Sequence, residues 1–369
     1  MRKVLLAGAL LLGACAKDRG PIVVGVTGPF SQPRGVSMQR AAQLAADEIN
    51  AKGGVRGRPL KLLFVDDSGS TDVAVRVAEG FRTNPEVVAV IGHLTSGTTI
   101  AAARVYGSGS HPVVMISPSA SSPDLSGLSP YAFRVCPSDL LHGPELARFA
   151  VQTLGARRAG IIYINDDYGR GIRGTFATEF RKLGGVVTEE DPYLASTASV
   201  EPYLAHMQLH GGVDVLVLAT DRPGAELGLK NLHDAGLTWP VVGGDALTGI
   251  EADGALAEGV HLSSAYLPDR PGDRNALFVA NYARTYEGQR PDHRGAGAYD
   301  ILYLLAQAMS DAGTDRAAIR DYLASVGTTR PPFDGVTGRI AFDANGDVPA
   351  KPVVIGVVHG GRLVTEAAK

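Results

Sequence analysis

The stretch VVAVIGHLTSGTTIAAARV, residues 87–105, decides the fold. Its first six residues are apolar except for a closing glycine, and an apolar run without alternation is typical of a strand buried on both faces of a parallel sheet. A loop rich in hydroxyl groups follows, and from residue 98 the apolar residues recur three and four positions apart, which predicts a helix. The stretch is therefore one strand, loop and helix unit.

The same unit recurs along the chain. A first set of strands is expected at 22–26, 60–67, 87–92 and 112–117, with helices at about 37–50, 71–83 and 98–107. A second set of strands is expected at 159–165, 186–191, 213–220 and 241–245, with helices at about 140–154, 169–183, 200–209 and 224–235. Apolar strands alternating with helices predict an α/β protein with two doubly wound parallel-sheet lobes in tandem.

The alternation stops near residue 266. Helices are expected at about 274–286, 296–311 and 316–325 without strands between them. Residues 338–364 then predict two strands around Asn345-Gly346, a dipeptide that favours hairpin turns. A helical block and a hairpin after two complete lobes suggest that the chain crosses back between the lobes, and several crossovers make a hinge.

Composition narrows the possible partners. The chain has 369 residues, of which 20% are charged, and its net charge is −3. This balance gives no electrostatic reason to expect a nucleic acid partner, and the length favours two domains.

The amino terminus predicts export. A positive segment at 1–3 and an apolar segment at 4–12 form a signal sequence that is too short to span a bilayer. The following LGAC resembles a bacterial lipobox, which implies a signal peptide over 1–15 and membrane anchoring through lipidated Cys15. An ordinary cleaved signal peptide is the alternative. Only Cys136 then remains, so no intramolecular disulfide is expected in the exported chain.

One motif would suggest a dehydrogenase. The sequence GRGIRG, residues 169–174, fits the glycine pattern of dinucleotide-binding loops and has acids about twenty residues further on. However, residues 165–168 separate the strand from the first glycine and would set two carboxylates beside an anionic pyrophosphate. We therefore expect a flexible turn between strand and helix, and an NAD-dependent oxidoreductase is the least favoured alternative.

Other chemical motifs are missing or incomplete. The chain has neither the nucleophile-elbow pattern nor a Walker sequence. His206 and His210 have helical ligand spacing, but no acid or cysteine nearby in the sequence completes a zinc site, so a solvated helix end is expected. Residues 343–347 imitate a calcium loop, yet Val348 and Val354 occupy positions that require glycine and glutamate. No catalytic residue, metal or cofactor is predicted.

Polar loops follow several of the expected strands. Residues 94–99 and 117–126 carry hydroxyl groups at the carboxyl ends of strands in the first lobe, where open α/β sheets bind ligands. Hydroxyls and helix N–H groups without arginine or lysine suit a small carboxylate. In the second lobe, 166–168, 220–221 and 244–245 offer acids that can pair with an ammonium group. The two lobes together would hold a zwitterion.

Several longer stretches carry a resemblance to a known family. They are DEINAKGGVRGRPLKLLFVDDSGS (47–70), VIGHLTSGTT (90–99), VMISPSASSPDL (114–125), YAFRVCPSD (131–139) and INDDYGRG (164–171). From about residue 22 onward the chain resembles type 1 periplasmic binding proteins, in the branch of the leucine/isoleucine/valine-binding proteins of ABC importers. This resemblance implies two lobes joined by a three-crossover hinge that close on a ligand. Lobe 1 would comprise 21–138 plus 267–330, and lobe 2 would comprise 139–266 plus 331–369.

The resemblance also implies roles for single residues. The ligand carboxylate would be held by Ser96, Ser119 and Ser121, the stacking tyrosine would be Tyr168, and Asp245 would bind the ligand ammonium.

Two positions depart from the family, because Asp221 and Arg294 stand where aromatic residues are common. If they face the cleft, they favour a polar or charged ligand over leucine.

The implied function is that of an exported solute-binding protein, at the periplasm or cell surface and anchored through Cys15. It would bind a small carboxylate ligand, most simply an amino acid with a branched-chain, neutral or polar side chain, and deliver it to the permease subunits of an ABC transporter. A ligand-sensing receptor protein on the same fold is the alternative.

Overall fold

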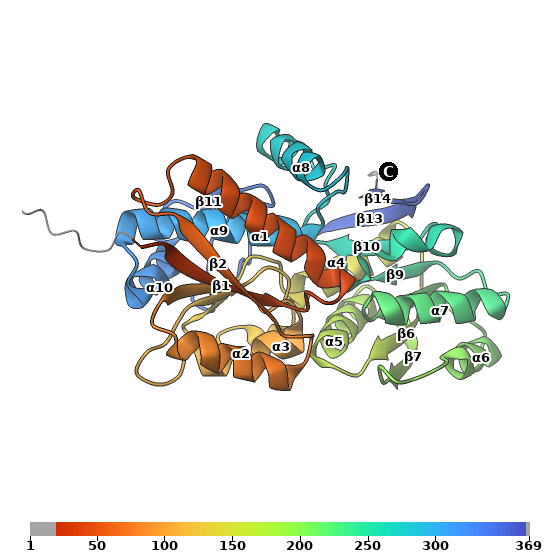
Figure 1. The fold of residues 1–369 in the computed structure, drawn as a ribbon. Helices are drawn as coiled ribbons and strands as arrows, with labels where there is room; N and C mark the ends of the chain where they lie inside the picture. The colour runs from red at the N-terminus through yellow and green to blue at the C-terminus, as the bar shows by residue number, and fades with distance from the viewer. Residues whose placement is uncertain (1–19, 367–369) are drawn as a thin grey trace, which may run out of the picture.

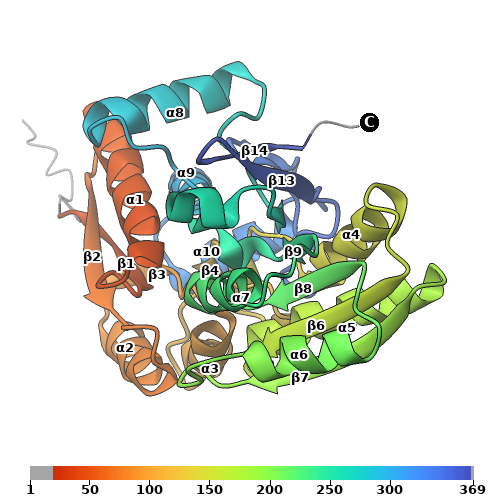
Figure 2. The ribbon, with the colours of Figure 1, turned by 90° about the vertical axis from the view of Figure 1, so that its right-hand side faces the viewer.

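The computed structural model describes residues 20–366, which form two α/β lobes side by side (Figures 1 and 2). The predicted fold class is confirmed, since each lobe is built on a largely parallel sheet covered by helices on both faces. Residues 1–15, with the predicted signal peptide and Cys15, lie outside the described residues. Within residues 20–366, no helix combines the length and the apolar character needed to cross a bilayer.

The sheet of the first lobe has five parallel strands in the order β2-β1-β3-β4-β5. Alternate residues of β1 enter different cores, with Val24 packing towards α1 and Val23 towards α2 and α3, which explains why the strand is apolar throughout. The elements are β1 (Ile22–Gly28), α1 (Pro33–Ala51), β2 (Leu60–Asp66), α2 (Thr71–Thr83), β3 (Val87–Ile91), α3 (Ser96–Tyr106), β4 (Met115–Ser117), the 3-10 turn η1 (Pro123–Leu125) and β5 (Ala132–Arg134).

The sheet of the second lobe has seven strands in the order β14-β13-β10-β9-β8-β6-β7, and only β13 and β14 are antiparallel to their neighbours. Helices α4 and α5 pack on one face, and α6 and α7 pack on the other. The elements are α4 (Asp139–Gln152), β6 (Arg158–Ile164), α5 (Asp167–Lys182), β7 (Val186–Tyr193), α6 (Glu201–Leu209), β8 (Val215–Ala219), α7 (Arg222–Asp234), β9 (Val241–Gly243), η2 (Asp245–Leu247), η3 (Ile250–Ala257), β10 (His261–Ser264), β13 (Val354–His359) and β14 (Arg362–Thr365).

The tail returns to the first lobe before it completes the second. Helices α8 (Asp273–Thr285), α9 (His293–Ala312) and α10 (Arg316–Ser325) lie on the side of α1, and α9 and α10 share its core (Figure 1). A two-stranded ribbon of β11 (Phe333–Gly335) and β12 (Gly338–Ile340) follows. The chain thus passes between the two sheets three times, after β5, after β10 and after β12.

The hairpin predicted around Asn345-Gly346 is wrong. These residues turn within a loop that contacts the first lobe, where the Arg134 guanidinium donates to Asp347 at 2.7 Å. The hairpins in this part of the chain join β11 to β12 and β13 to β14, and the second of them turns at Gly360-Gly361. Both of these glycines have positive φ, at 57° and 71°, which glycine adopts without a steric penalty.

The segment after β12 also packs with the first lobe. Ile340, Phe342 and Val348 belong to the same core as β1 and α9, and the Phe342 ring meets that of Phe133 edge-on, with 5.0 Å between the ring centroids. The chain therefore returns to the second sheet after residue 348, later than the boundary at 331 that the sequence suggested.

The GRGIRG motif lies inside helix α5, so the flexible turn expected there is wrong. A side chain at Gly169 would collide with the carbonyl oxygen of Ile164, and one at Gly171 would collide with the carboxylate of Asp139. These two glycines allow α5 to approach β6 and the start of α4 closely. The glycine pattern is thus explained by helix packing.

Candidate functional site

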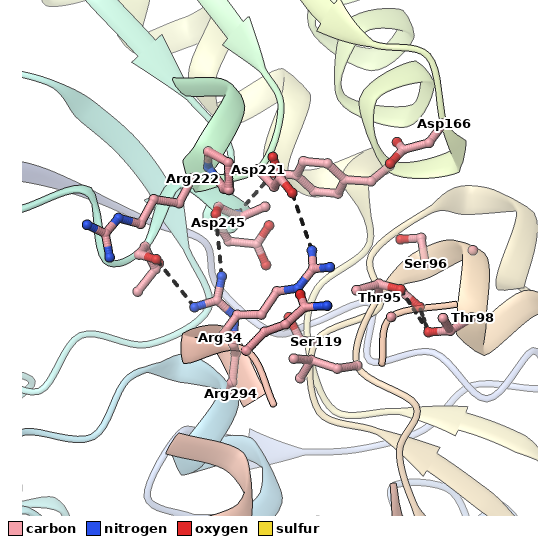
Figure 3. Close-up of a pocket in the computed structure, with 18 of the residues that line it drawn as sticks. Arg34, Thr95, Ser96, Thr98, Ser119, Asp166, Asp221, Arg222, Asp245 and Arg294 are labelled. Atoms are coloured by element: carbon pink, nitrogen blue, oxygen red, sulfur yellow. Dashed lines mark hydrogen bonds and ion pairs between the residues drawn. The ribbon is translucent and has the colours of Figure 1, made fainter. Parts of the chain in front are cut away.

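A cavity of about 670 Å³ lies between the two lobes (Figure 3). Loops at the carboxyl ends of β1, β3 and β4 line it from the first lobe, and loops after β6, β8 and β9 line it from the second. In both sheets these include the strands where the winding direction reverses, the usual ligand position in open α/β sheets. The side chains that line it include Arg34, Thr95, Ser96, Thr98, Ser119, Asp166, Tyr168, Asp221, Arg222, Asp245, Thr248 and Arg294.

Three helices that begin at this cavity are capped by aspartates. In each, the carboxylate accepts a hydrogen bond from the backbone N–H of the glycine three residues later, which satisfies one free donor of the first turn. The pairs are Asp166 with Gly169 in α5 at 2.8 Å, Asp221 with Gly224 in α7 at 3.3 Å, and Asp292 with Gly295 in α9 at 3.0 Å. The positive ends of these helices are therefore already occupied by the protein's own carboxylates.

Helix α3 lacks such a cap. The hydroxyl of its N-cap residue, Thr95, contacts the Thr98 hydroxyl at 2.8 Å and no side chain accepts from the first backbone N–H groups. Ser96 begins the helix and is 3% exposed, and its hydroxyl accepts from the Ser122 N–H at 3.2 Å. The N-terminus of α3 thus offers free N–H donors and hydroxyls to an anion in the cavity. Helix α1 is also uncapped, but it begins with Pro33, which has no N–H.

Asp245 lies across the cavity from α3 and is 1% exposed. Neither of its carboxylate oxygens has a hydrogen-bond partner among the described residues. His293 Nε2 lies 3.5 Å from Oδ2, but burial first, and then the charge of Arg294, lower the pKa of His293 to about 4, so its ring is neutral at pH 7. A buried carboxylate without a partner is costly, which makes Asp245 a receptor for a cationic group.

Tyr168 forms the wall beside Asp245. Its hydroxyl accepts from the backbone N–H of Ala246 at 3.1 Å, and burial, followed by the charge of Asp245, raises its pKa. Any side chain at Gly244 would collide with this hydroxyl. Glycine at that position is therefore what allows the tyrosine to lie against the loop that carries Asp245.

Two arginines bring positive charge to the same space. Arg294 is 5% exposed, and its guanidinium donates to Asp292 at 3.0 Å and to the carbonyls of Ala246 and Thr248 at 3.4 Å each. Arg34 pairs with Asp221 at 3.4 Å, a contact between the two lobes (Figure 3). The Nε of Arg34 is buried and has no hydrogen-bond partner in the part of the chain that the structure describes, and burial is the main cause that lowers the pKa of this guanidinium.

The structure brings most of the expected site residues to the cavity. Ser96, Ser119, Tyr168, Asp221, Asp245 and Arg294 line it. The hydroxyl of Ser119 contacts His293 Nε2 at 3.1 Å. Ser121 differs, because it is fully buried beside Asp139 and is not part of the cavity lining.

Sequence reasoning missed Arg34, Asp292 and Thr248. Arg34 lies in the first turn of α1, and nothing in the local sequence marks its contact with the other lobe. The three capping aspartates share the pattern D-x-x-G, at 166–169, 221–224 and 292–295. The signal is weak, because the same pattern also occurs at 66–69, 124–127, 269–272 and 343–346, where the aspartate caps no helix.

Comparisons with known proteins agree with this architecture. Residues 21–362 match the family model described as periplasmic binding protein. An amino acid binding protein of Pseudomonas aeruginosa is 27% identical, over 96% of this chain and 95% of its own. A substrate-binding protein of an ABC transporter from Desulfitobacterium hafniense, solved with leucine, is 31% identical, with a TM-score of 0.81 over 94% of this chain and 100% of its own.

A third relative is the branched-chain amino acid transporter substrate-binding protein of Streptococcus pneumoniae, solved with isoleucine. It is 26% identical, with a TM-score of 0.82 over 93% of this chain and 97% of its own. The family match spans nearly all of the described residues, and both lobes are included in each alignment. The chain belongs to the periplasmic binding protein family.

Proposed function

We propose that this chain is the extracytoplasmic solute-binding protein of an ABC importer and that its ligand is an amino acid. One observation carries the proposal: the cavity sets the uncapped N-terminus of α3, at Ser96 and Thr98, opposite Asp245, a buried carboxylate with no hydrogen-bond partner among the described residues. The ligand carboxylate would accept from the α3 N–H groups and the Ser96 hydroxyl, and the ligand ammonium would donate to Asp245. A zwitterion satisfies both groups at once.

The relatives support the ligand class. The Desulfitobacterium hafniense protein was solved with leucine, and the Streptococcus pneumoniae protein was solved with isoleucine. The Pseudomonas aeruginosa relative is an amino acid binding protein. Amino acids of this size fit a cavity of about 670 Å³.

The charges in the cavity favour a ligand with a polar side chain over leucine. Arg34, Asp221 and Arg294 all line it, together with the apolar residues Pro33, Leu94, Tyr168, Pro223 and Ala246. An aliphatic side chain would displace water from guanidinium and carboxylate groups without replacing the lost hydrogen bonds. A side-chain amide, hydroxyl or carboxylate would replace them.

Binding would work through closure of the lobes. Each hydrogen bond to a charged ligand group is worth roughly 1.5–3 kcal/mol net, and here the groups come from both lobes. Only the closed form makes all of these bonds, so the ligand shifts the population towards it. The closed form is what a permease would recognise.

The test is calorimetric titration of amino acids into the wild type, Ser96→Ala and Asp245→Asn. Asp245→Asn should weaken the binding of an amino acid by tenfold or more, since a loss of about 1.4 kcal/mol in binding free energy is tenfold in affinity. It should leave unchanged the binding of the corresponding acid without an amino group. Ser96→Ala should weaken the binding of both ligands. Glu226→Gln is the control, because Glu226 also lines the cavity but is exposed. Equal losses for both ligands in Asp245→Asn would remove the ammonium assignment.

The proposal includes anchoring through lipidated Cys15 and delivery to permease subunits. Cys15→Ser should then move the protein from the membrane fraction to the soluble fraction of its own host, and unchanged fractionation would contradict the anchor. A sensor on the same fold is the second candidate. Deletion of the permease genes separates the two, because an importer loses ligand uptake in that strain whereas a sensor keeps its response.

A further inference from the structure

Three side chains that could bind a metal ion converge at the outer edge of the second lobe, away from the cavity. Glu189 lies on β7, which is the edge strand of the seven-stranded sheet, and His206 and His210 lie on and just after α6 (Figure 1). Their ligand atoms all lie within 4.8 Å of one another. The sequence suggested a solvated helix end because the acid that completes the group is seventeen residues upstream of His206 and on a different element.

The distances suit a small divalent ion. Glu189 Oε1 lies 3.2 Å from His206 Nδ1 and 3.6 Å from His210 Nδ1. Nitrogen and oxygen ligands bind zinc at about 2.0–2.2 Å, so two ligands of a tetrahedral ion stand roughly 3.3–3.5 Å apart. The three atoms are thus spaced like one face of such a coordination sphere. The two imidazoles are about half exposed, with side chains 55% and 56% accessible, so an ion can reach them from solvent.

A second carboxylate increases the negative potential at this place. Asp191 follows Glu189 by two residues on β7, which puts it on the same face of the strand. Its Oδ2 is buried, and no hydrogen-bond partner for it lies within residues 20–366. A cation would relieve the crowding of these two carboxylates.

We propose that Glu189, His206 and His210 form a surface site for a divalent transition metal of the zinc class, with Asp191 as a nearby carboxylate that strengthens it electrostatically. Imidazole nitrogens with one carboxylate select zinc, nickel, cobalt or copper over magnesium and calcium, which prefer oxygen ligands. The site would tie the edge strand β7 to α6. The remaining coordination positions would be filled by water.

Metal binding at this site must compete with protons. The Nδ1 of His210 lies 2.9 Å from the carbonyl oxygen of His206, the geometry of a hydrogen bond donated by the ring. This nitrogen has to lose its proton before it can bind a metal, as must any protonated imidazole of the pair.

The test uses the full chain without an affinity tag, stripped with a chelator and then titrated with ZnCl₂ by calorimetry. We expect one zinc ion per chain, a rise in melting temperature with zinc and no response to MgCl₂ or CaCl₂. The variants His206→Ala, His210→Ala and Glu189→Gln should each weaken zinc binding by roughly tenfold or more, since even the loss of a residue that only orients a metal ligand costs about 10–100-fold. His233→Ala is the control, because His233 is 79% exposed beside Asp234 on another helix.

Cobalt supplies a direct readout of coordination. Co²⁺ should give visible absorption bands of a histidine-ligated ion in the wild type, and His206→Ala/His210→Ala should lose them while keeping the same circular dichroism. No zinc uptake by the wild type, or an unchanged affinity in that double variant, would overturn the proposal. Equal losses in His233→Ala would do so too, because the ion would then be bound by scattered surface histidines.

Discussion

His293 is a buried histidine that joins the two lobes. Its Nε2 contacts the Ser119 hydroxyl at 3.1 Å in the first lobe, and its Nδ1 contacts the Thr248 hydroxyl at 3.3 Å in the second. A neutral ring can donate at one nitrogen and accept at the other. Burial lowers its pKa to about 4, from an ordinary value of 6.5. The unfolded chain therefore binds one more proton than the folded chain between these two pH values.

This difference predicts that His293 contributes to acid destabilisation. Because the group stays neutral in the folded state, the free energy of unfolding should fall as the pH drops from 6.5 towards 4, by up to roughly 3 kcal/mol from this residue. Above pH 6.5 the protonation of His293 should not change the free energy of unfolding. His293→Gln keeps a polar group and cannot titrate, so it should lose less stability over the same range than the wild type does.

Urea unfolding of the ligand-free protein at pH 7 and pH 4.5 measures this difference. The comparison of variant with wild type is needed because other buried groups also titrate. Burial lowers the pKa of His142 and raises that of Asp139, and these two shifts act on stability in opposite directions. The same pH dependence in both proteins would show that His293 is not held neutral.

A carboxylate cap at the start of helix α3 should raise the stability of the ligand-free protein and lower its affinity for the ligand. Thr95→Asp would give α3 the same carboxylate cap that α5, α7 and α9 already have. We expect the ligand-free protein to gain about 1 kcal/mol from the cap. The affinity for a ligand with a carboxylate should fall by roughly tenfold or more, because like charges a few ångström apart repel by more than about 1.4 kcal/mol.

Thr95→Asn separates the two effects, since asparagine caps a helix without carrying a charge. It should give the gain in melting temperature with a smaller loss of affinity. Thermal unfolding and calorimetric titration of the three proteins measure both quantities. If Thr95→Asp binds an amino acid as tightly as the wild type does, the ligand carboxylate does not lie at α3.

The elements differ in how far the sequence predicts them. Long apolar strands such as β1 and β6 were predicted to within two residues at each end, because their burial on both faces leaves a continuous apolar run. The short strands β5 and β10 were missed, since three or four residues with polar members give no periodic signal. The dipeptide Asn345-Gly346 correctly indicates a turn. The sequence did not show where this turn lies in the fold, which is beside the first lobe, where Arg134 contacts Asp347.

The site shows the same contrast between features that a local sequence pattern predicts and contacts between residues distant in the sequence. Ser96 and Asp245 could each be placed at the carboxyl-end edge of the sheet in its own lobe, because open α/β sheets bind ligands there. The contact between Arg34 and Asp221 could not be predicted, because the two residues are 187 positions apart and belong to different lobes. Charge pairs across a hinge depend on how the lobes meet, which no local pattern encodes.

The two lobes are each complete α/β units with separate cores, so their relative position depends on the crossovers and on what lies in the cleft. The ion pair of Arg34 with Asp221 is one of these cleft contacts. Its side chains are 30% and 29% exposed, so its contribution is that of a partly solvated pair, between about 0 and 1 kcal/mol. It can bias closure without holding the empty protein shut.

A double-mutant cycle on this pair tests its part in closure. Arg34→Gln and Asp221→Asn should each weaken ligand binding. The double variant should lose less binding free energy than the sum of the two single losses, with a coupling energy of at most about 1 kcal/mol. The coupling should shrink at high salt, because the pair is partly exposed. Small-angle scattering of the ligand-free single variants should show a larger radius of gyration than the wild type.

Arg170→Gln is the matched control, because Arg170 also lines the cavity but pairs with Asp167 of its own helix. It should leave both the radius of gyration and the salt dependence of affinity unchanged. Additive losses for Arg34→Gln and Asp221→Asn would mean that the pair does not stabilise the closed form. Each residue would then act on the ligand separately, Arg34 through its unpartnered Nε and Asp221 through the α7 cap, and closure would depend on the ligand contacts and the three crossovers alone.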